Sequence, residues 1–478
     1  MVKAIGVTCM NSTEIDKNIQ NTLITYLEVY HPLMSIVKKI NKKGGRVLLV
    51  GGAVRDLLLG RPIKDLDIEV HGLSLEDFEA ILKKFGGVVF VGKSFGVLRL
   101  HGLDVDWALP RTDSVGRKPD VEIDPYMGIK SAFRRRDLTI NSMGIDLSTF
   151  DLLDPYGGYE HLKKGILHAT DEAKFVEDPL RFYRVMQFVG RFGMHPDEQL
   201  NEICKKMDVS EVSTERIETE FEKLILKSKY PSLGIRWLKD LSRLAEILPE
   251  VASVVGIPQN PAWHPEGEVF EHTMQCLDAS AAFDYDDDEQ QLMVMYAALC
   301  HDLGKSITTQ DVGGVFKSIG HSKEGVAISK KLLTRITKKK DLIEAVGKLV
   351  RYHMAPSQFI AANAKPAAYK RLAKNLAPHA TLQMLAKVAL ADKQGRNPIK
   401  GKPLKKKLPV IDKFLEKAKD AKVEKKPEPP VLLGRDLFDV VEPGPKMGEL
   451  LKKAYELQIE EGIKDKKELK KKILEDKQ

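Results

Sequence analysis

The stretch that decides the fold runs from Gly51 to Asp67 and reads GGAVRDLLLGRPIKDLD. It follows the β-branched run 46–50 (RVLLV), so the pattern predicts a strand, a glycine turn and a short helix. Asp65 and Asp67 stand two apart in the alternating segment DLDIEV, which predicts a second strand with both carboxylates on one face. Two such carboxylates repel unless a cation lies between them. We therefore predict that they bind Mg²⁺ and are catalytic.

The glycine turn and a third acid extend this candidate site. Gly51 and Gly52 precede a helix, so backbone N–H groups there can approach phosphate oxygens. Arg55 can add a charge-assisted fork to a phosphate. Asp106, in the segment GLDVDWALPR, is the candidate third catalytic acid, and Asp104 is its rival. The sequence thus predicts a nucleotide-binding and metal-binding site.

Composition limits the classes of protein that remain. The 478 residues allow about three domains of roughly 150 residues. With 43% hydrophobic and 30% charged residues, a collagenous or fully disordered chain is excluded. The net charge of +8 fits a nucleic-acid or phosphate partner. The four cysteines form no CxxC pair, which indicates a reducing, cytoplasmic location, and no apolar run is long enough for a membrane.

Four further motifs follow in order along the chain: RRDLTINSM (135–143), DPYGG (154–158), EDPLRFYR (177–184) and ERIETE (215–220). Together with the glycine turn and the acid pair, they resemble the class II tRNA nucleotidyltransferases (CCA-adding enzymes) and the bacterial poly(A) polymerases. The resemblance implies a DNA polymerase beta-like head with a small mixed sheet. It also implies Mg²⁺ in the head and addition of CMP, CMP and AMP to the tRNA 3′ end from CTP and ATP, without a nucleic-acid template.

The resemblance also assigns residues to the nucleotide. Asp178 and Arg181, three apart on an expected helix, would recognise the bases of CTP and ATP. The polar segment 112–131 fits a mobile loop needed for adding the terminal A. The other expected nucleotide contacts, beyond the glycine turn and Arg55, are Arg111, Arg135, Arg136, Asp137, Asn141 and Arg184. For Asp137 a structural role is equally open.

The helical second half carries a separate set of metal-ligand types. His272, His301, Asp302 and Asp392 occur in the segments EVFEHTM, YAALCHDLGK and ALADKQGR. This order resembles the HD phosphohydrolase domain, which implies a divalent metal (Mg, Mn, Ni or Co) and hydrolysis of phosphomonoesters and 2′,3′-cyclic phosphates. His321 and Glu324 are expected to line the same site. His353 is expected to be structural.

The expected fold is therefore α+β: a mixed-sheet nucleotidyltransferase head, then an all-helical neck and a helical HD domain. Bacterial poly(A) polymerase, an HD phosphohydrolase with a vestigial head, and a non-catalytic RNA-binding protein are the alternatives. The oligomeric state stays open. The expected parts are an N-terminal helical extension (1–29), the head (30–170), the neck and body (171–260), the HD domain (261–400), a lysine- and proline-rich linker (401–430) and a helical tail (431–478).

Overall fold

A computed structural model describes residues 12–90, 97–113, 121–398 and 407–475. The chain divides into two compact units, residues 1–212 and 213–478. The first contains a mixed sheet with helices and the second is almost entirely helical, so the expected α+β fold is confirmed. The finer domain boundaries stay predictions. Within the described ranges, no helix is both long and apolar enough to cross a bilayer.

The sheet of the first unit has eight strands in the order β1-β10-β9-β2-β3-β6-β5-β4. Neighbouring strands are antiparallel except for β3 and β6, which are parallel. The strands are β1 (Ser12–Glu14), β2 (Arg46–Val50), β3 (Asp67–His71), β4 (Val88–Phe90), β5 (Val97–Leu100), β6 (Leu103–Ala108), β9 (Gly144–Asp146) and β10 (Asp151–Leu153).

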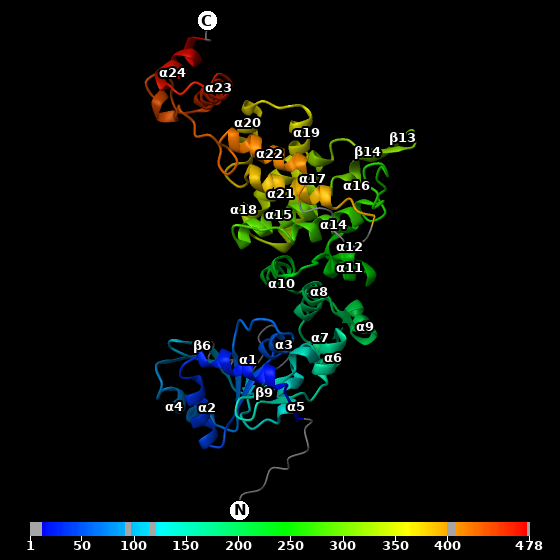
Figure 1. Ribbon diagram of the computed structural model, residues 1–478, viewed down its shortest axis with the longest axis vertical. Helices are drawn as coiled ribbons and strands as arrows, with labels where there is room; N and C mark the ends of the chain where they lie inside the picture. Colours follow the sequence, from blue (N-terminus) through cyan, green and yellow to red (C-terminus); the bar gives the residue numbers. More distant parts are fainter. Residues whose placement is uncertain (1–11, 91–96, 114–120, 399–406, 476–478) are drawn as a thin grey trace, which may run out of the picture. The chain divides into compact units, whose positions relative to one another are not determined.

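The N-terminal region forms two helices rather than one. Apolar residues recur at helical spacing over 14–42, but the structure has α1 (Lys17–Glu28) and α2 (Leu33–Lys42). The break falls at Pro32, whose ring and missing N–H prevent a helix from running through it. Helix α2 contacts β2 and α4 (Leu75–Leu82), and Figure 1 shows these two helices beside the sheet.

Short elements complete the first unit. Helix α3 (Gly52–Leu58) follows the glycine turn, as predicted. The remaining elements are β7 (Arg111–Asp113) paired with β8 (Val121–Ile123), α5 (Ile129–Arg134), the 3-10 turn η1 (Thr139–Asn141), α6 (Gly158–Lys164), β11 (Ile166–Leu167) paired with β12 (His195–Pro196), α7 (Glu172–Val176), α8 (Leu180–Phe192) and α9 (Glu198–Lys206).

The second unit is a helical bundle. Helices α14, α15, α17, α18 and α21 pack on one another (Figure 1). Every residue of α14 is buried. The helices are α10 (Thr214–Lys227), α11 (Ser232–Asp240), α12 (Leu244–Ile247), α13 (Pro249–Ala252), α14 (Val269–Ser280), α15 (Asp288–Cys300), α16 (Lys305–Thr308), α17 (His321–Ile336), α18 (Lys340–Tyr352), α19 (Ala355–Ala361), α20 (Pro366–Leu376) and α21 (Leu382–Gln394), with a hairpin of β13 (Thr309–Val312) and β14 (Val315–Ser318).

The segment expected to be a solvated linker is partly helical. Residues 399–406 lie outside the described residues, but 409–420 form α22, with Ile411, Phe414 and Ala418 buried. These apolar residues recur at helical spacing beneath the lysines, so a description by charge and proline content alone missed them. After η2 (Gly434–Leu437), α23 (Pro445–Glu461) and α24 (Lys466–Glu475) share a small core.

Candidate functional sites in the sheet and in the helical bundle

The acid pair lies where the sequence predicts it. Asp67 begins β3 and Asp65 stands two residues before it; both are exposed while Leu66 between them is buried, so the carboxylates share one face. Strand β6 runs parallel to β3 with Asp106 opposite Asp67, and the Asp106 N–H donates to the Leu66 carbonyl at 3.0 Å. The register therefore brings Asp106, rather than Asp104, directly beside the pair.

The charges around Asp67 favour a cation. Partial desolvation and the neighbouring Asp106 and Asp65 raise the pKa of Asp67 above its ordinary value, although the charge of Arg136 opposes this. Asp106 accepts hydrogen bonds from both Nε and Nη2 of Arg99, the latter at 3.0 Å. Carboxylates held this close are the oxygen ligands that Mg²⁺ takes together with substrate phosphates, so this residue set fits such an ion.

The glycine turn lies beside these acids. Gly51 has φ +72°, and a Cβ atom there would lie 2.6 Å from Arg136 Nη1 and 4.0 Å from Asp67 Oδ2. A side chain would therefore strain the backbone and displace Arg136. Gly52 begins α3. The turn thus leaves room for an arginine next to the acid pair.

Glu69 was missed by the sequence analysis. It is 1% exposed, accepts from His71 at 3.0 Å, and lies 3.6 Å from Arg135 and 3.7 Å from Arg136. Burial alone raises the pKa of Glu69, but the hydrogen bond from His71 and the two arginines lower it to about 2. Its signal was present in DLDIEV, because the alternation places residue 69 on the same face as Asp67.

A buried polar chain joins several expected nucleotide contacts. Arg55 Nη1 donates to Asn141 Oδ1 at 2.6 Å, and Asn141 Nδ2 donates to Asp137 Oδ1 at 2.8 Å. Arg184 Nε donates to the other Asp137 oxygen at 2.6 Å. Arg55 also binds Asp56 and is 5% exposed, so its guanidinium is directed into the protein. Burial raises the pKa of Asp137, but Arg184 and Asn141 lower it to about 2.

The sequence analysis expected Asp178 and Arg181 on one helix, but only Arg181 lies on a helix in the structure. Helix α8 starts at Leu180, whose N–H donates to Asp178 Oδ1 at 3.1 Å, so Asp178 lies in the turn before the helix. The turn forms because the carboxylate satisfies a backbone donor that has no partner within the helix. Arg181 donates to the carbonyls of Lys174 at 2.6 Å and Arg135 at 2.5 Å, which ties this motif to the RRD motif.

The remaining head predictions concern a segment that is only partly described. Arg111 begins β7, in the two-stranded β7–β8 sheet outside the eight-stranded sheet. The expected mobile loop 112–131 therefore contains paired strands and the start of α5. Residues 114–120 of that loop lie outside the described residues.

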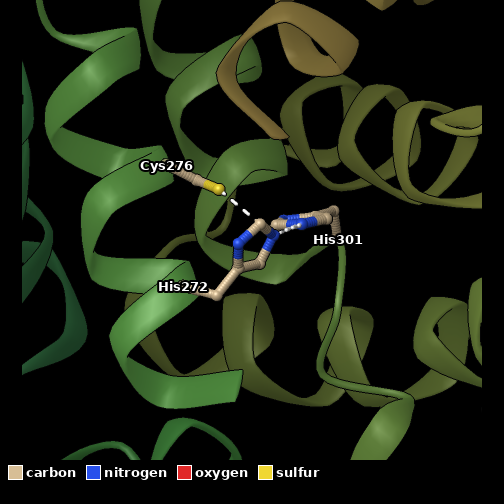
Figure 2. A group of neighbouring side chains, drawn as sticks. All are labelled: His272, Cys276 and His301. Carbon is tan, nitrogen blue, oxygen red and sulfur yellow. Dashed lines mark hydrogen bonds between the residues drawn. The ribbon is translucent and has the colours of Figure 1, made fainter. Parts of the chain in front are cut away.

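The histidines of the second unit converge in the bundle, as expected. His272 Nε2 lies 3.2 Å from His301 Nε2, 3.3 Å from Asp392 Oδ1 and 3.5 Å from Asp302 Oδ2. Figure 2 shows the His272 and His301 rings next to each other in an edge-on arrangement, with Cys276 pointing at His272. The residues come from α14, the end of α15 and α21. Their buried nitrogen and oxygen donors fit a divalent metal.

The other ring nitrogens show how these histidines are oriented. Nδ1 of His272 lies 2.8 Å from Glu266 Oε1, and Nδ1 of His301 lies 2.8 Å from the Ala298 carbonyl. Each Nδ1 therefore donates, which leaves Nε2 as the atom directed at the shared centre. Two Nε2 atoms 3.2 Å apart require a proton or a metal ion between them.

A second group shares Asp302. His321 Nε2 lies 3.3 Å from Asp302 Oδ1 and 3.3 Å from His353 Nε2, while both Nδ1 atoms contact backbone carbonyls. His353, expected to be structural, thus belongs to a set that could hold a metal. Glu324 is exposed and belongs to none of the candidate metal groups among the described residues.

Charged neighbours shift the pKa values of the bundle site. Burial raises the pKa of both Asp302 and Asp392. Lys305 and the histidines nevertheless hold the pKa of Asp302 well below its ordinary value, and Arg396 and His272 do the same for Asp392. Lys305 lies 2.7 Å from Asp302, and Arg396 lies 2.8 Å from Asp392. Desolvation lowers the pKa of His272, but Cys276, Asp392 and Glu266 raise it well above its ordinary value. The centre thus favours positive charge.

Two known protein families match the two regions that carry these sites. Residues 47–168 match the Poly A polymerase head domain, and residues 269–393 match the HD domain. The first range contains the acids of β3 and β6. The second contains every proposed histidine and aspartate ligand of the bundle.

Curated relatives match both regions in one chain. A multifunctional CCA protein of Chromobacterium violaceum is 34% identical over 362 residues, 73% of this chain and 84% of the relative. One of Nitrosospira multiformis is 34% identical over 316 residues, 64% of this chain and 73% of the relative.

Solved structures share the fold. A Thermotoga maritima CCA-adding enzyme complexed with tRNA has a TM-score of 0.55 at 23% identity, covering 97% of both chains. A Bacillus stearothermophilus CCA-adding enzyme in complex with CTP has a TM-score of 0.62 at 21% identity, covering 97% of this chain and 98% of that one.

Proposed function

This chain belongs to the family of multifunctional CCA proteins, and we propose that it adds CMP, CMP and AMP to the 3′ end of tRNA, using CTP and ATP and no nucleic-acid template. The observation that carries the proposal is the parallel pairing of β3 and β6, which sets Asp106 opposite Asp67 and next to Asp65. In each step the tRNA 3′-oxygen bonds to the α-phosphorus and pyrophosphate leaves.

In this proposal Asp65, Asp67 and Asp106 hold Mg²⁺, which supplies charge stabilisation for the displacement. Arg135 and Arg136, held beside the acids by Glu69, bring positive charge toward the triphosphate. The backbone of Gly51 and Gly52 approaches the phosphates from the start of α3. Arg55 and Arg184 contribute through the buried chain that fixes Asn141 and Asp137, and Arg111 contacts the nucleotide from the start of β7.

Asp178 and Arg181 select the base in this proposal. Arg181 donates N–H groups to two backbone carbonyls, so the fold fixes the orientation of the guanidinium that it presents to a base. Such preorganisation suits a site that must replace a template, because a mobile arginine would accept several bases.

A second activity is proposed for the bundle: metal-dependent hydrolysis of phosphomonoesters and 2′,3′-cyclic phosphates. His272, His301, Asp302 and Asp392 would hold one divalent ion (Mg, Mn, Ni or Co). Asp302, His321 and His353 offer an adjacent position that shares the Asp302 carboxylate. A cytoplasmic location is proposed with these activities, because tRNA is the substrate and the free cysteines among the described residues are buried.

The alternatives are less well supported. The curated relatives that share both regions are named for CCA rather than for poly(A). A vestigial head would have no need to keep three acids in register beside an arginine.

The test is incubation with tRNA lacking its 3′ CCA, with labelled CTP, labelled ATP, or both. Two added residues with CTP alone and three with both nucleotides support the proposal. A long tract with ATP alone supports poly(A) polymerase instead. No incorporation, together with metal-dependent hydrolysis of a 2′,3′-cyclic nucleotide, supports the vestigial head.

A further inference from the structure

Cys276 lies in the bundle centre and is not among the four proposed ligands of the metal site. It stands four residues after His272 on α14, so both side chains project from the same face of the helix. Its Sγ lies 3.4 Å from His272 Nε2 and is fully buried (Figure 2). His272, Cys276 and His301 form one of the groups able to hold a metal ion.

We propose that Cys276 is a ligand of this centre, which makes it a nitrogen, oxygen and sulfur site that selects Co²⁺, Ni²⁺ or Zn²⁺ over Mg²⁺ and Mn²⁺. The proposal rests on the proposed metal site of the bundle. It adds to that site a metal preference that comes from the Cys276 side chain.

The spacing of the donor atoms matches a shared ion. Four polar atoms surround His272 Nε2 at 3.2 to 3.5 Å, from His301, Asp392, Cys276 and Asp302. A single ring nitrogen can make one hydrogen bond, so most of these contacts are not hydrogen bonds. Zinc-type bonds of about 2.0–2.1 Å to nitrogen and about 2.3 Å to sulfur at tetrahedral angles separate the ligand atoms by about 3.3–3.6 Å.

The fold holds the thiol in this place. A Cβ atom on Gly395, just after α21, would lie 2.3 Å from Cys276 Sγ and 3.0 Å from the His272 carbonyl. The absence of a side chain at 395 therefore lets the end of α21, which carries Asp392, close onto the thiol. Cys276 is thus fixed between the first histidine and the last aspartate of the site.

The ligand chemistry sets the expected selectivity. Thiolate is a soft ligand that suits Zn²⁺, Co²⁺ and Ni²⁺, whereas Mg²⁺ and Mn²⁺ prefer carboxylate, carbonyl and water. A metal that binds a thiol displaces its proton, so binding at Cys276 adds one released proton and one metal–sulfur bond. Histidines and aspartates alone would not impose this preference as strongly.

The experiment uses the full chain loaded with Co²⁺. A visible absorption band reports cobalt held by the protein through any ligands, and a near-ultraviolet charge-transfer band reports a cobalt–thiolate bond. We expect wild type to show both. Cys276→Ser should lose the near-ultraviolet band, keep the visible band, and bind Co²⁺ at least tenfold more weakly while Mn²⁺ affinity changes little.

Two further variants show which site of the protein gives rise to the absorption bands. Cys204→Ser changes a buried thiol on α9 of the first unit and should keep both bands. His301→Ala removes a central nitrogen ligand and should weaken both. Serine is close to cysteine in size, so the packing against Gly395 survives, and the melting temperature of each metal-free variant checks this.

The outcomes separate the two proposals. A visible band without a near-ultraviolet band in wild type, or a near-ultraviolet band that persists in Cys276→Ser, overturns the role of Cys276 and leaves the metal site standing. If equilibrium dialysis finds equal amounts of bound Co²⁺, Ni²⁺, Zn²⁺, Mn²⁺ and Mg²⁺ in wild type and in the variant that combines His301→Ala with Asp302→Ala, the metal site of the bundle is overturned, and Cys276 with it.

Discussion

The chain brings together its two sets of candidate metal ligands in different ways. In the sheet, three carboxylates lie on two paired strands and at least Asp65 and Asp67 reach the surface. In the bundle, His272, His301 and Asp302 are at most 2% exposed, and Asp392 comes from a helix that lies 90 residues after Asp302 in the sequence.

This difference separates two kinds of site. The sheet site is open and its candidate metal ligands are all carboxylates, so it needs substrate phosphates to complete its metal coordination. The bundle site is closed and carries its own nitrogen, oxygen and sulfur donors. In the proposed functions, the open site would act on the end of a large polynucleotide and the closed one on a small phosphate ester.

The largest expected effect comes from substitutions that disrupt only the sheet site. Asp67→Ala should lower the rate of nucleotide addition by roughly a thousandfold, because loss of a metal removes several kcal/mol of transition-state stabilisation. Asp106→Ala should behave alike, whereas Asp104→Ala should retain activity, since only Asp106 lies opposite Asp67. Addition is measured on tRNA lacking CCA. Equal loss in Asp104→Ala and Asp106→Ala would contradict the register argument.

The next prediction concerns substitutions that disrupt only the bundle site. Combining His301→Ala with Asp302→Ala should eliminate hydrolysis of 2′,3′-cyclic nucleotides while CMP and AMP addition stays largely intact. The reason is that the sheet site takes none of its ligands from the second unit. Paired assays with added Mg²⁺, Mn²⁺, Ni²⁺ or Co²⁺ measure this. Loss of addition in the double variant would show that the two activities are coupled.

A smaller effect concerns base choice. Arg181→Lys keeps the positive charge but loses the planar fork that reaches the carbonyls of Lys174 and Arg135. Misincorporation of UMP or GMP relative to CMP and AMP should rise, by an amount equivalent to roughly 1–3 kcal/mol. Lys163→Ala, at an exposed ion pair of the same unit, is the control. A slower variant with unchanged selectivity would make Arg181 a purely structural residue.

The smallest expected effect concerns stability and pH. The lowered pKa of Glu69, about 2, means that its ionised form stabilises the fold above the unfolded value near 4.5. Glu69→Gln should therefore lower the free energy of unfolding of the first unit at pH 7 by at most about 3 kcal/mol. The gap between variant and wild type should narrow as pH falls from 5 toward 3. Denaturant titrations at each pH measure it, and a constant gap would contradict the ion-pair account.

The sequence by itself determined the acid pair, the glycine turn and the order of the motifs. These depend on neighbours within one strand or one turn, where spacing fixes which side chains share a face. The same logic could have identified Glu69, which alternates with Asp67 in DLDIEV. Local periodicity also predicted β2, α3 and the helical character of the second half.

Only the tertiary structure decided which distant residues meet. The register of β3 with β6 brought Asp106 to Asp67, and the packing of α14, α15, α17, α18 and α21 placed Cys276 and His353 beside the expected ligands. These outcomes depend on strand register and side-chain packing. Such terms act between segments far apart in the chain, and no local pattern encodes them.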